Sequence, residues 1–364
     1  MARTLKAIID SAALKHNFAK VREFCPHQKI IAMIKANGYG HGMINVAKTL
    51  SDADGFGVAC LEEAVQCRAA GISQRIFVMG GFYEAKTELP EILRLNLDLI
   101  LHQEEQVINL IRFLNTVQNK NTLLPLKVWI KLNTGMNRLG FKPQHFAPVL
   151  HCLSQHPLLQ IEGFMTHFAN ADKDNDPLTP QQIEIFFKTV QGLPGVKSLA
   201  NSAGIMAWST AHGDWVRPGI MLYGISPLQN RHGAMEGLKP IMSLTSTLIA
   251  IQEAKKGEIV GYGGRYVCPT DRRIGVVAAG YGDGYPRVAP DGTPVLLNGR
   301  RVPLVGQVSM DMIMIDLSSQ PAAKVGDPVL LWGPGLPVEE VAAVVGTSAY
   351  ELLTRLTTRV PLIW

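Results

Sequence analysis

The sequence predicts a (β/α)8 barrel followed by a mainly β C-terminal domain, and three observations support this prediction. Up to about residue 225, short apolar runs alternate with stretches of helical periodicity, which is typical of parallel strands joined by helices. Ionisable and polar residues gather where those apolar runs end. After Pro227 the helical patterns become rare, and β-like runs follow one another between turns rich in Gly, Pro and Asp.

The first part of the chain holds eight strand candidates with helical stretches between them. The strands are expected at 29–34, 55–59, 75–79, 98–101, 126–132, 161–166, 197–200 and 214–216. The helices are expected at 44–50, 62–70, 89–95, 104–114, 144–153, 181–190 and, shorter, at 204–208. A doubly wound open sheet is the alternative, and the count of eight strands favours the barrel.

The second part of the chain reads as mainly β. Its strand candidates are 243–251, 275–279, 294–297, 301–305 and 312–317, and helical patterns return only at 338–345 and 350–356. We therefore expect domains at 1–235 and 236–364, joined near 228–240. The first strand, about 3–10, precedes the first barrel helix and is a candidate to pair with the second domain.

The composition narrows the class of protein. The chain has 364 residues, 47% of them hydrophobic, which is enough for two domains with large cores. Lys6 and Asp10 interrupt the only N-terminal apolar stretch, so no secretory signal is expected. No stretch of eighteen residues lacks charges or strong breakers, which argues against a membrane span. The formal net charge of +5 is scattered, which argues against nucleic-acid binding and suits small anionic ligands.

The cysteines and histidines indicate neither a disulfide framework nor a metal site. The five cysteines are odd in number, widely spaced and without a Cys-x-x-Cys pair, which predicts a reducing, cytoplasmic location. His41 and His102 lack partners at metal-ligand spacing, so no metal is expected.

Lys35 is the most informative single residue. It ends the apolar run 30–34 and opens a turn containing Gly38, Gly40 and Gly42, so its amine lies at the rim of a predicted core. Partial loss of water there lowers a lysine pKa, and a neutral amine can form Schiff bases with carbonyl compounds. A strand-end lysine that simply reaches water is the alternative on position alone.

Other polar residues fall at the carboxyl ends of the predicted strands, where barrels place their chemistry. They are Lys131 with nearby Arg138, then His167, Asn201 with Ser202, and Arg217. The loops after the seventh and eighth strands often bind phosphate in such barrels. Here these loops offer the amide and hydroxyl of Asn201 and Ser202 and the backbone N–H groups of Gly219 and Ile220, although ordinary turns remain the alternative for each.

Residues 34–42, Ile-Lys-Ala-Asn-Gly-Tyr-Gly-His-Gly, closely resemble the pyridoxal-phosphate attachment motif of the alanine racemase family. Further blocks of the same family match in order at 131–140, 166–169, 200–203, 216–224, 260–263, 279–285 and 308–311. The resemblance implies an isomerase that interconverts L- and D-alanine by a two-base mechanism and supplies D-alanine for peptidoglycan. It also implies bound pyridoxal 5'-phosphate and a homodimer with shared active sites.

The resemblance assigns roles to the matching residues. Lys35 matches the lysine that carries the cofactor, and Arg217 matches the residue that faces the pyridine nitrogen. Because arginine stays protonated, the ring nitrogen is then expected to remain unprotonated, which weakens the cofactor as an electron sink. The positions that match the phosphate ligands are Tyr39, Ser202, Gly219, Ile220 and Tyr350.

Racemisation needs a base on each face of the cofactor, and the resemblance implies Lys35 for one face and Tyr262 for the other. A tyrosine has a pKa near 10 and needs positive neighbours to act near neutrality, and His167, linked to an arginine, is the family's candidate. Arg138 matches a residue that orients the cofactor phenolate and the substrate carboxylate. Met310 of the other subunit is expected to bind that carboxylate through its N–H, and Tyr281 to narrow the pocket.

Lys131 resembles a position that carries a carbamate in many relatives, and an unmodified lysine is the alternative. Asn133 stands where relatives often have Asp, which leaves the local charge balance open. A racemase of broader specificity, or one acting on serine, is the nearest alternative function. A non-catalytic pyridoxal-phosphate-binding barrel is the alternative from another class, and the long second domain argues against it.

Overall fold

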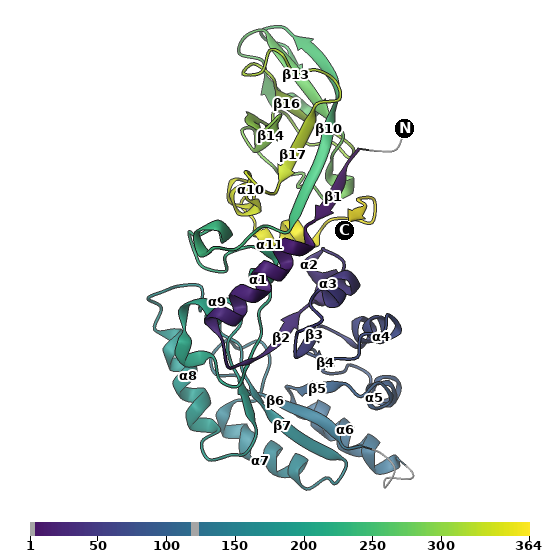
Figure 1. Cartoon of the computed structure of the whole chain (residues 1–364), viewed down its shortest axis with the longest axis vertical. Coiled ribbons are helices and arrows are strands. Elements are labelled where there is room, and N and C mark those ends of the chain that lie inside the picture. Colours follow the sequence, from purple (N-terminus) through teal and green to yellow (C-terminus); the bar gives the residue numbers. More distant parts are fainter. Residues whose placement is uncertain (1–3, 118–123) are drawn as a thin grey trace.

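The computed structural model describes residues 4–117 and 124–364, which form a barrel with a β domain stacked on one of its ends (Figure 1). Eight parallel strands build the barrel sheet in the order β8-β7-β6-β5-β4-β3-β2-β9. Backbone hydrogen bonds join the first and last strands of this order, from Asp214 N to Lys197 O (2.8 Å) and from Arg217 N to Ala200 O (2.9 Å). The predicted barrel is therefore confirmed, and the open sheet is excluded.

The barrel strands lie close to the predicted runs. They are β2 (Lys29–Met33), β3 (Gly55–Val58), β4 (Arg75–Val78), β5 (Asp98–Leu101), β6 (Leu126–Lys131), β7 (Leu159–Met165), β8 (Val196–Ser198) and β9 (Trp215–Val216). Most of their residues are buried, because strands of a closed parallel sheet are covered on both faces. Phe77, Trp129 and Trp215 pack edge to face inside the barrel, with ring centroids 5.5–6.1 Å apart.

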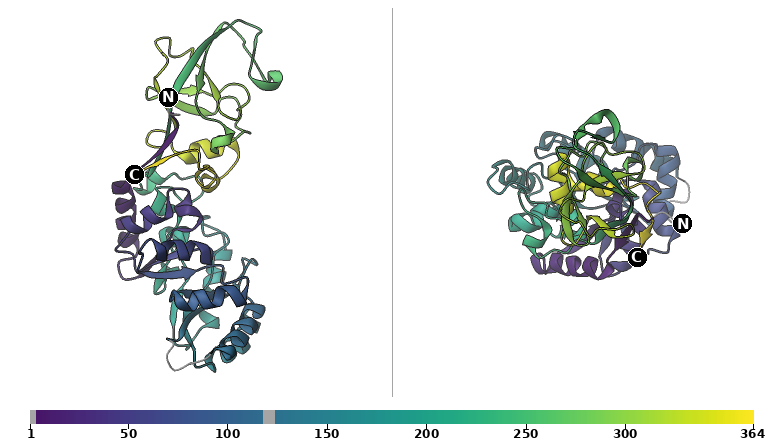
Figure 2. Two further views of the ribbon diagram at one scale, coloured as in Figure 1. Left: turned by 90° about the vertical axis from the view of Figure 1, so that its right-hand side faces the viewer. Right: turned by 90° about the horizontal axis from the view of Figure 1, so that it is seen from above.

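Helices surround the barrel strands (Figure 2). They are α1 (Ser11–Phe24), α3 (Met43–Thr49), α4 (Leu61–Ala69), α5 (Ala85–Arg94), α6 (Glu104–Thr116), α7 (Pro143–Ser154), α8 (Leu178–Thr189) and α9 (Ser202–Ala207). Helix α1 begins where the Asp10 carboxylate accepts the N–H groups of Ala12 and Ala13, a typical N-cap. Within the described residues, no helix combines the length and the apolar character that a membrane span requires.

The β domain is built on the long strand β10 (Met242–Ala254), which Figure 1 shows rising from the barrel. Strands β13 (Arg272–Val277) and β17 (Pro328–Trp332) pair with β10. The sheet continues with β14 (Pro294–Leu297) beside β17, β15 (Arg300–Pro303) beside β14, and β16 (Ile313–Asp316) beside β13. The short strands β11 (Ile259–Val260) and β12 (Tyr266–Val267) form a separate hairpin. Two helices, α10 (Val338–Val345) and α11 (Ala349–Thr354), return the chain to the barrel end.

The N-terminal strand β1 (Lys6–Ile9) belongs to the sheet of the β domain. It pairs antiparallel with β10 and parallel with the C-terminal strand β18 (Leu362–Ile363). Strands β17 and β18 were not expected from the sequence. Pro328 opens β17 and Pro361 directly precedes β18, and proline is disfavoured within sheets except on edge strands, at the first residue of a strand or at bulges.

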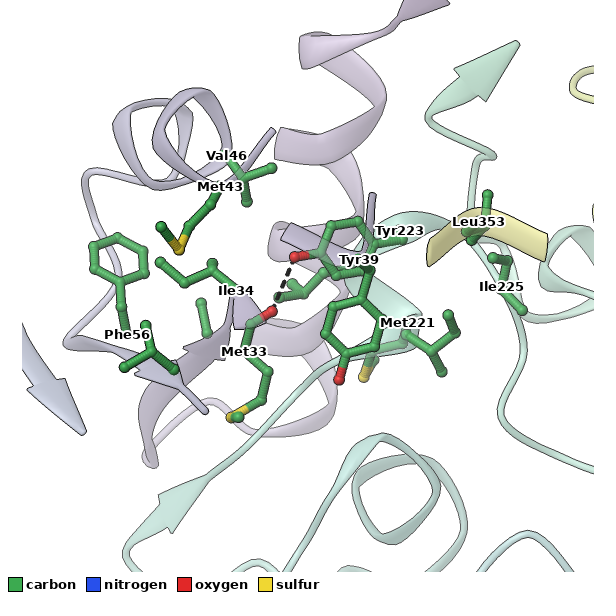
Figure 3. Close-up of a cluster of buried hydrophobic side chains, with 14 of the residues drawn as sticks. Met33, Ile34, Tyr39, Met43, Val46, Phe56, Met221, Tyr223, Ile225 and Leu353 are labelled. Carbon is green, nitrogen blue, oxygen red and sulfur yellow. Dashed lines mark hydrogen bonds between the residues drawn. The ribbon is translucent and has the colours of Figure 1, made fainter. Parts of the chain in front are cut away.

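The two domains meet at a buried cluster next to the end of β2 (Figure 3). Tyr223 donates a hydrogen bond from its hydroxyl to Met33 O (2.9 Å) and stacks on Tyr39 with ring centroids 4.7 Å apart. Leu353 of α11 lies in the same cluster. Lys35 lies two residues beyond this anchored strand end, so packing between the domains fixes where its amine emerges.

Candidate active site

A cavity of about 620 Å³ opens at the carboxyl end of the barrel strands, a size typical of a cofactor or small-ligand site. Most residues predicted for the site contribute to its lining. They are Lys35, Tyr39, Lys131, Arg138, His167, Asn201, Ser202, Arg217, Gly219, Ile220 and Tyr350. The structure thus brings together residues spread over more than three hundred positions of sequence.

Lys35 opens a left-handed turn. The segment α2 (Lys35–Tyr39) has helical hydrogen bonding, but Ala36, Asn37 and Tyr39 have φ angles of 52–53°. Such a run is unfavourable by roughly 1–2 kcal/mol for each non-glycine residue, so surrounding contacts have to hold it in place. His41 is one such contact, because its Nδ1 lies 2.9 Å from Tyr39 O and 3.1 Å from Gly38 O.

The pKa of Lys35 lies below its usual value, chiefly because the surrounding protein removes water from the amine. The positive charges of Arg138 and Arg217 lower this pKa further, while the Glu63 carboxylate opposes them. The neutral amine, which is the nucleophilic form, is therefore favoured more than in a free lysine.

The Ser202 and Tyr39 hydroxyls, with Gly219 beside them, form a cradle on the β8–β9 side of the cavity. Ser202 Oγ accepts the N–H groups of Gly219 (2.8 Å) and Met221 (3.4 Å), which leaves the hydroxyl hydrogen to donate. A Cβ at position 219 would lie 2.5 Å from Tyr39 Oη, so only glycine allows this approach. Burial raises the pKa of Tyr39 to about 12, and its hydroxyl remains a donor near neutral pH.

Arg217 is buried in the lining of the cavity, and among the described residues no carboxylate accepts a hydrogen bond from it. Its guanidinium donates to Thr166 O (2.6 Å), Ser198 O (2.8 Å), Ser198 Oγ (2.6 Å) and Leu199 O (3.1 Å). Burial lowers the pKa of Arg217 to about 10, so the group still carries its charge near neutral pH. Three backbone carbonyls at the ends of neighbouring strands therefore fix this cation in one orientation.

Lys131 and His167 lie in the same positive field. Burial lowers the pKa of Lys131 to about 7, with repulsion from Arg217, Arg138 and Lys35 adding to the effect. Burial also holds the pKa of His167 well below its usual value, assisted by repulsion from the same cations. His167 is therefore neutral near pH 7 in this chain, and the positive potential of the cavity comes from the arginines.

The loop that carries Arg138 is held by hydrogen bonds of the Asn133 side chain. The Asn133 side-chain oxygen accepts the N–H groups of Gly135 (3.2 Å) and Asn137 (3.0 Å), and its Nδ2 donates to Asn137 Oδ1 (3.2 Å). Asparagine thus supplies both an acceptor and a donor at this position, where a carboxylate would supply only acceptors.

Two residues that support the site through hydrogen bonds were not predicted from the sequence. The buried Gln182 donates from Nε2 to Thr134 Oγ1 (3.1 Å) and His167 O (3.0 Å), which joins the loops after β6 and β7. Glu63 accepts the N–H group of Ala36 (2.7 Å) beside Lys35. Both residues lie in helical patterns, where a polar side chain gives no local sign of a distant partner.

Tyr262, Tyr281 and Met310 do not join the other predicted residues. None of the three is among the described residues that line the cavity, and all lie in the β domain. Tyr262 and Met310 are 72% and 52% exposed. The segments of Tyr281 and Met310 lie side by side, because Tyr281 N donates to Ser309 O (3.0 Å) and Gly282 N to Met310 O (2.9 Å).

Comparison with known proteins accounts for both domains. Residues 9–227 match the family model "Alanine racemase, N-terminal domain", and residues 241–364 match "Alanine racemase, C-terminal domain". The chain is 50% identical over 355 residues to the biosynthetic alanine racemase of Escherichia coli (strain K12), with 97% of each chain covered.

Solved structures show the same relationship. The biosynthetic alanine racemase of Pseudomonas aeruginosa matches with a TM-score of 0.94 at 48% identity, over 99% of both chains. An alanine racemase from Bartonella henselae, described with covalently bound pyridoxal phosphate, matches with a TM-score of 0.89 at 28% identity over 99% of both chains. These matches extend through the β domain, which does not favour a cofactor-binding barrel without catalysis. The chain belongs to the alanine racemase family.

Proposed function

We propose that this protein interconverts L- and D-alanine with pyridoxal 5'-phosphate held by Lys35, and so supplies D-alanine for peptidoglycan. The observation that supports this most strongly is the cavity, in which an amine of lowered pKa faces both an anion cradle and a buried arginine. Family membership supports the same reaction and does not favour serine as the main substrate.

The residues of the cavity fit the cofactor. The cradle of Ser202, Gly219 and Tyr39 offers the Ser202 and Tyr39 hydroxyls as donors suited to a phosphate, and the missing Cβ of Gly219 leaves room beside the Tyr39 hydroxyl. Asn201, Ile220 and Tyr350 complete the lining on that side. When bound, the cofactor would withdraw electrons from the amino acid and so acidify the hydrogen on Cα.

Arg217 would keep the ring nitrogen unprotonated. Its pKa of about 10 leaves the guanidinium charged near neutrality, and a charged arginine donates hydrogen bonds but accepts none. This arrangement limits electron withdrawal, which favours simple proton exchange over side reactions. Arg138, on the loop held by Asn133, would orient the substrate carboxylate.

Two proton carriers are needed because the hydrogens of the two enantiomers lie on opposite faces of the cofactor plane. Lys35 Nζ would hold the proton on one face, and the low pKa of its amine suits that task. Tyr262 would hold the proton on the other face through its hydroxyl.

Tyr262 would come from a second copy of the chain. We propose a homodimer in which each β domain covers the cavity of its partner and adds Tyr262, Tyr281 and the Met310 N–H. The exposure of Tyr262 and Met310 on their own chain supports this arrangement.

Two further features follow from the same proposal. A pKa of about 7 gives Lys131 a sizeable neutral fraction near pH 7, which is the form that reacts with carbon dioxide, so we propose that Lys131 carries a carbamate.

A cytoplasmic location is proposed because all five cysteines are free.

The direct test is to purify the protein, examine it for bound cofactor, and follow both alanine enantiomers by chiral chromatography, with serine in parallel. We expect a pyridoxal absorbance band, a labelled Lys35 peptide after borohydride reduction, and faster exchange of alanine than of serine. Absence of both the cofactor and alanine exchange would reject the proposal.

A further inference from the structure

Glu63, in the first turn of helix α4, joins that helix to two strand ends of the barrel. Its Oε1 accepts the N–H group of Ala36 at 2.7 Å, and its Oε2 accepts the N–H group of Ala59 at 2.7 Å. Ala36 directly follows Lys35, and Ala59 directly follows strand β3. One carboxylate therefore ties the lysine turn to the neighbouring strand.

The Ala59 contact is an ordinary helix-start interaction, but the Ala36 contact is not. Glu63 is the third residue of α4, where a glutamate commonly reaches back to backbone N–H groups at the start of its own helix. The bond to Ala59 N serves that purpose. The second oxygen reaches a residue 27 positions earlier in the chain, and helix formation alone does not require it.

The Ala36 contact acts at the first residue of the strained segment. Ala36 begins the run of positive φ angles, and the turn continues with Gly38 N donating to Ile34 O (2.7 Å) and Gly40 N to Ala36 O (3.0 Å). A charged acceptor forms a stronger hydrogen bond than a neutral one, so Glu63 is well suited to hold this unfavourable backbone.

Glu63 also supplies a negative charge in a positive environment. The charged groups around the Lys35 amine are Arg138 on the loop after β6, Lys131 at the end of β6, Arg217 after β9, and Glu63 on α4, while His167 after β7 is neutral near pH 7. Arg138 and Arg217 lower the pKa of Lys35, after the larger effect of burial, and Glu63 raises it.

We propose that Glu63 is a positioning residue for the reaction at Lys35, because its carboxylate anchors the left-handed turn to strand β3 and balances the cations around the Lys35 amine. This inference rests on the proposed function for its catalytic meaning. The anchoring itself is a property of the chain without substrate.

The test compares three variants of the full-length chain. Glu63→Gln removes the charge and one of the two acceptor oxygens. Glu63→Asp keeps the charge but shortens the side chain by one methylene, so it cannot reach both N–H groups. Glu62→Gln, on the adjacent exposed residue, is the matched control for loss of a charge from the same helix.

The first readout is hydrogen exchange of the Ala36 and Ala59 amides, measured by mass spectrometry with residue-level fragmentation on the protein as purified. Glutamine keeps one acceptor oxygen, so in Glu63→Gln we expect at least one of the two amides to exchange about tenfold faster or more, and neither to change in Glu62→Gln. Wild-type protection of both amides in Glu63→Gln would overturn the anchoring role.

The second readout is the pH at which Lys35 is half-labelled by trace acetic anhydride, after carbonyl ligands have been removed with hydroxylamine. We expect this pH to fall in Glu63→Gln, since a charge that raises the pKa is lost, and to stay near the wild-type value in Glu63→Asp. An unchanged value in Glu63→Gln, or an equal fall in Glu62→Gln, would overturn the charge-balancing role.

The third readout is racemisation of alanine by the cofactor-loaded enzyme. We expect kcat to fall roughly tenfold or more in Glu63→Gln, with partial recovery in Glu63→Asp. If Glu63→Gln does not fold, Glu63→Asp provides the test, since unchanged exchange of both Ala36 and Ala59 in that variant would also contradict the proposal. Exchange and labelling need no activity, so an inactive wild type would reject the proposed function without affecting this test.

Discussion

The barrel and the β domain differ in how deeply they bury their predicted functional residues. Arg217 and Lys131 are buried at the cavity of their own chain, and Arg217 is fixed by hydrogen bonds to the ends of β7 and β8. Tyr262 and Met310 lie on the surface of the β domain and are mostly exposed. The cavity of one chain presents one amine and the cradle proposed for a phosphate. The proposed second proton carrier has to come from a different surface, and the difference predicts an active site completed between chains.

Replacing Lys35 should have the largest effect, because it removes both the cofactor attachment and one proton carrier from the barrel side. We expect Lys35→Ala to lower racemisation in both directions by about 10³-fold or more. Chiral chromatography measures the rates, and a thermal melt checks that the variant folds. Activity within tenfold of wild type would show that Lys35 is not needed for the proposed reaction.

Replacing Tyr262 should affect the two directions unequally, because it removes the proton carrier of one face only. We expect Tyr262→Phe to lower kcat by roughly 10²–10⁴-fold. Exchange of the Cα hydrogen with deuterated solvent should persist for one enantiomer and be lost for the other, as followed by NMR. Small and equal losses for both enantiomers would contradict the assignment of Tyr262 to one face.

Lys131 provides a prediction about stability and pH within the barrel. Its pKa is about 7 in the folded chain against 10.5 for an ordinary lysine, so the unfolded chain binds more protons between these values. The destabilisation from this group is therefore complete below about pH 7 and disappears as the pH rises toward 10.5.

In buffers freed of carbon dioxide and bicarbonate, where the proposed carbamate is absent, Lys131→Met should then flatten the rise of unfolding free energy between pH 7 and 10, with a gain of the order of a few kcal/mol at pH 7. Denaturant titrations at several pH values measure this. Lys127→Met, on the same strand, is the control and should retain the wild-type slope. Added bicarbonate should restore the proposed carbamate on Lys131, which stabilises the protein and reverses the sign at neutral pH, so we expect a bicarbonate-dependent melting temperature.

Tyr223→Phe should have the smallest effect and tests the contact between the two domains. It removes the buried hydrogen bond to Met33 O shown in Figure 3 and keeps the ring that stacks on Tyr39. We expect a loss of about 1 kcal/mol, or roughly 2–4 °C in melting temperature, with kcat within a few-fold of wild type. Tyr83 is exposed, so Tyr83→Phe is the control and should have the melting temperature of the wild type. A larger loss of activity than of stability would show that this junction positions Lys35 more strictly than we infer.

Much of the barrel could be predicted from the sequence because its strands are buried on both faces. Such strands read as continuous apolar runs, and β5 (Asp98–Leu101) lies at its predicted bounds. Most of the cavity was also predictable, since strands of one barrel end at the same mouth and bring Lys131 and Arg217 together.

The remainder depends on contacts that the sequence does not encode locally. Glu63 and Gln182 bind partners 27 and 48 positions away, and nothing in their own helices distinguishes them from solvent-exposed polar residues. The left-handed run after Lys35 was expected only as a turn, because Ala36 and Tyr39 are not residues that usually adopt positive φ. Strand β18 forms only because β1 provides an edge beside it.

The most direct measurement mixes the two inactive variants, Lys35→Ala and Tyr262→Phe, which alter opposite sides of the proposed shared site. The two chains carry different affinity tags, and the mixed dimer is isolated by purification on both. If each site takes Lys35 from one chain and Tyr262 from its partner, one of the two sites is intact, and racemisation should return to about half the wild-type rate. A mixed dimer no more active than its parents would show that the two residues do not meet across the dimer, and would contradict this account.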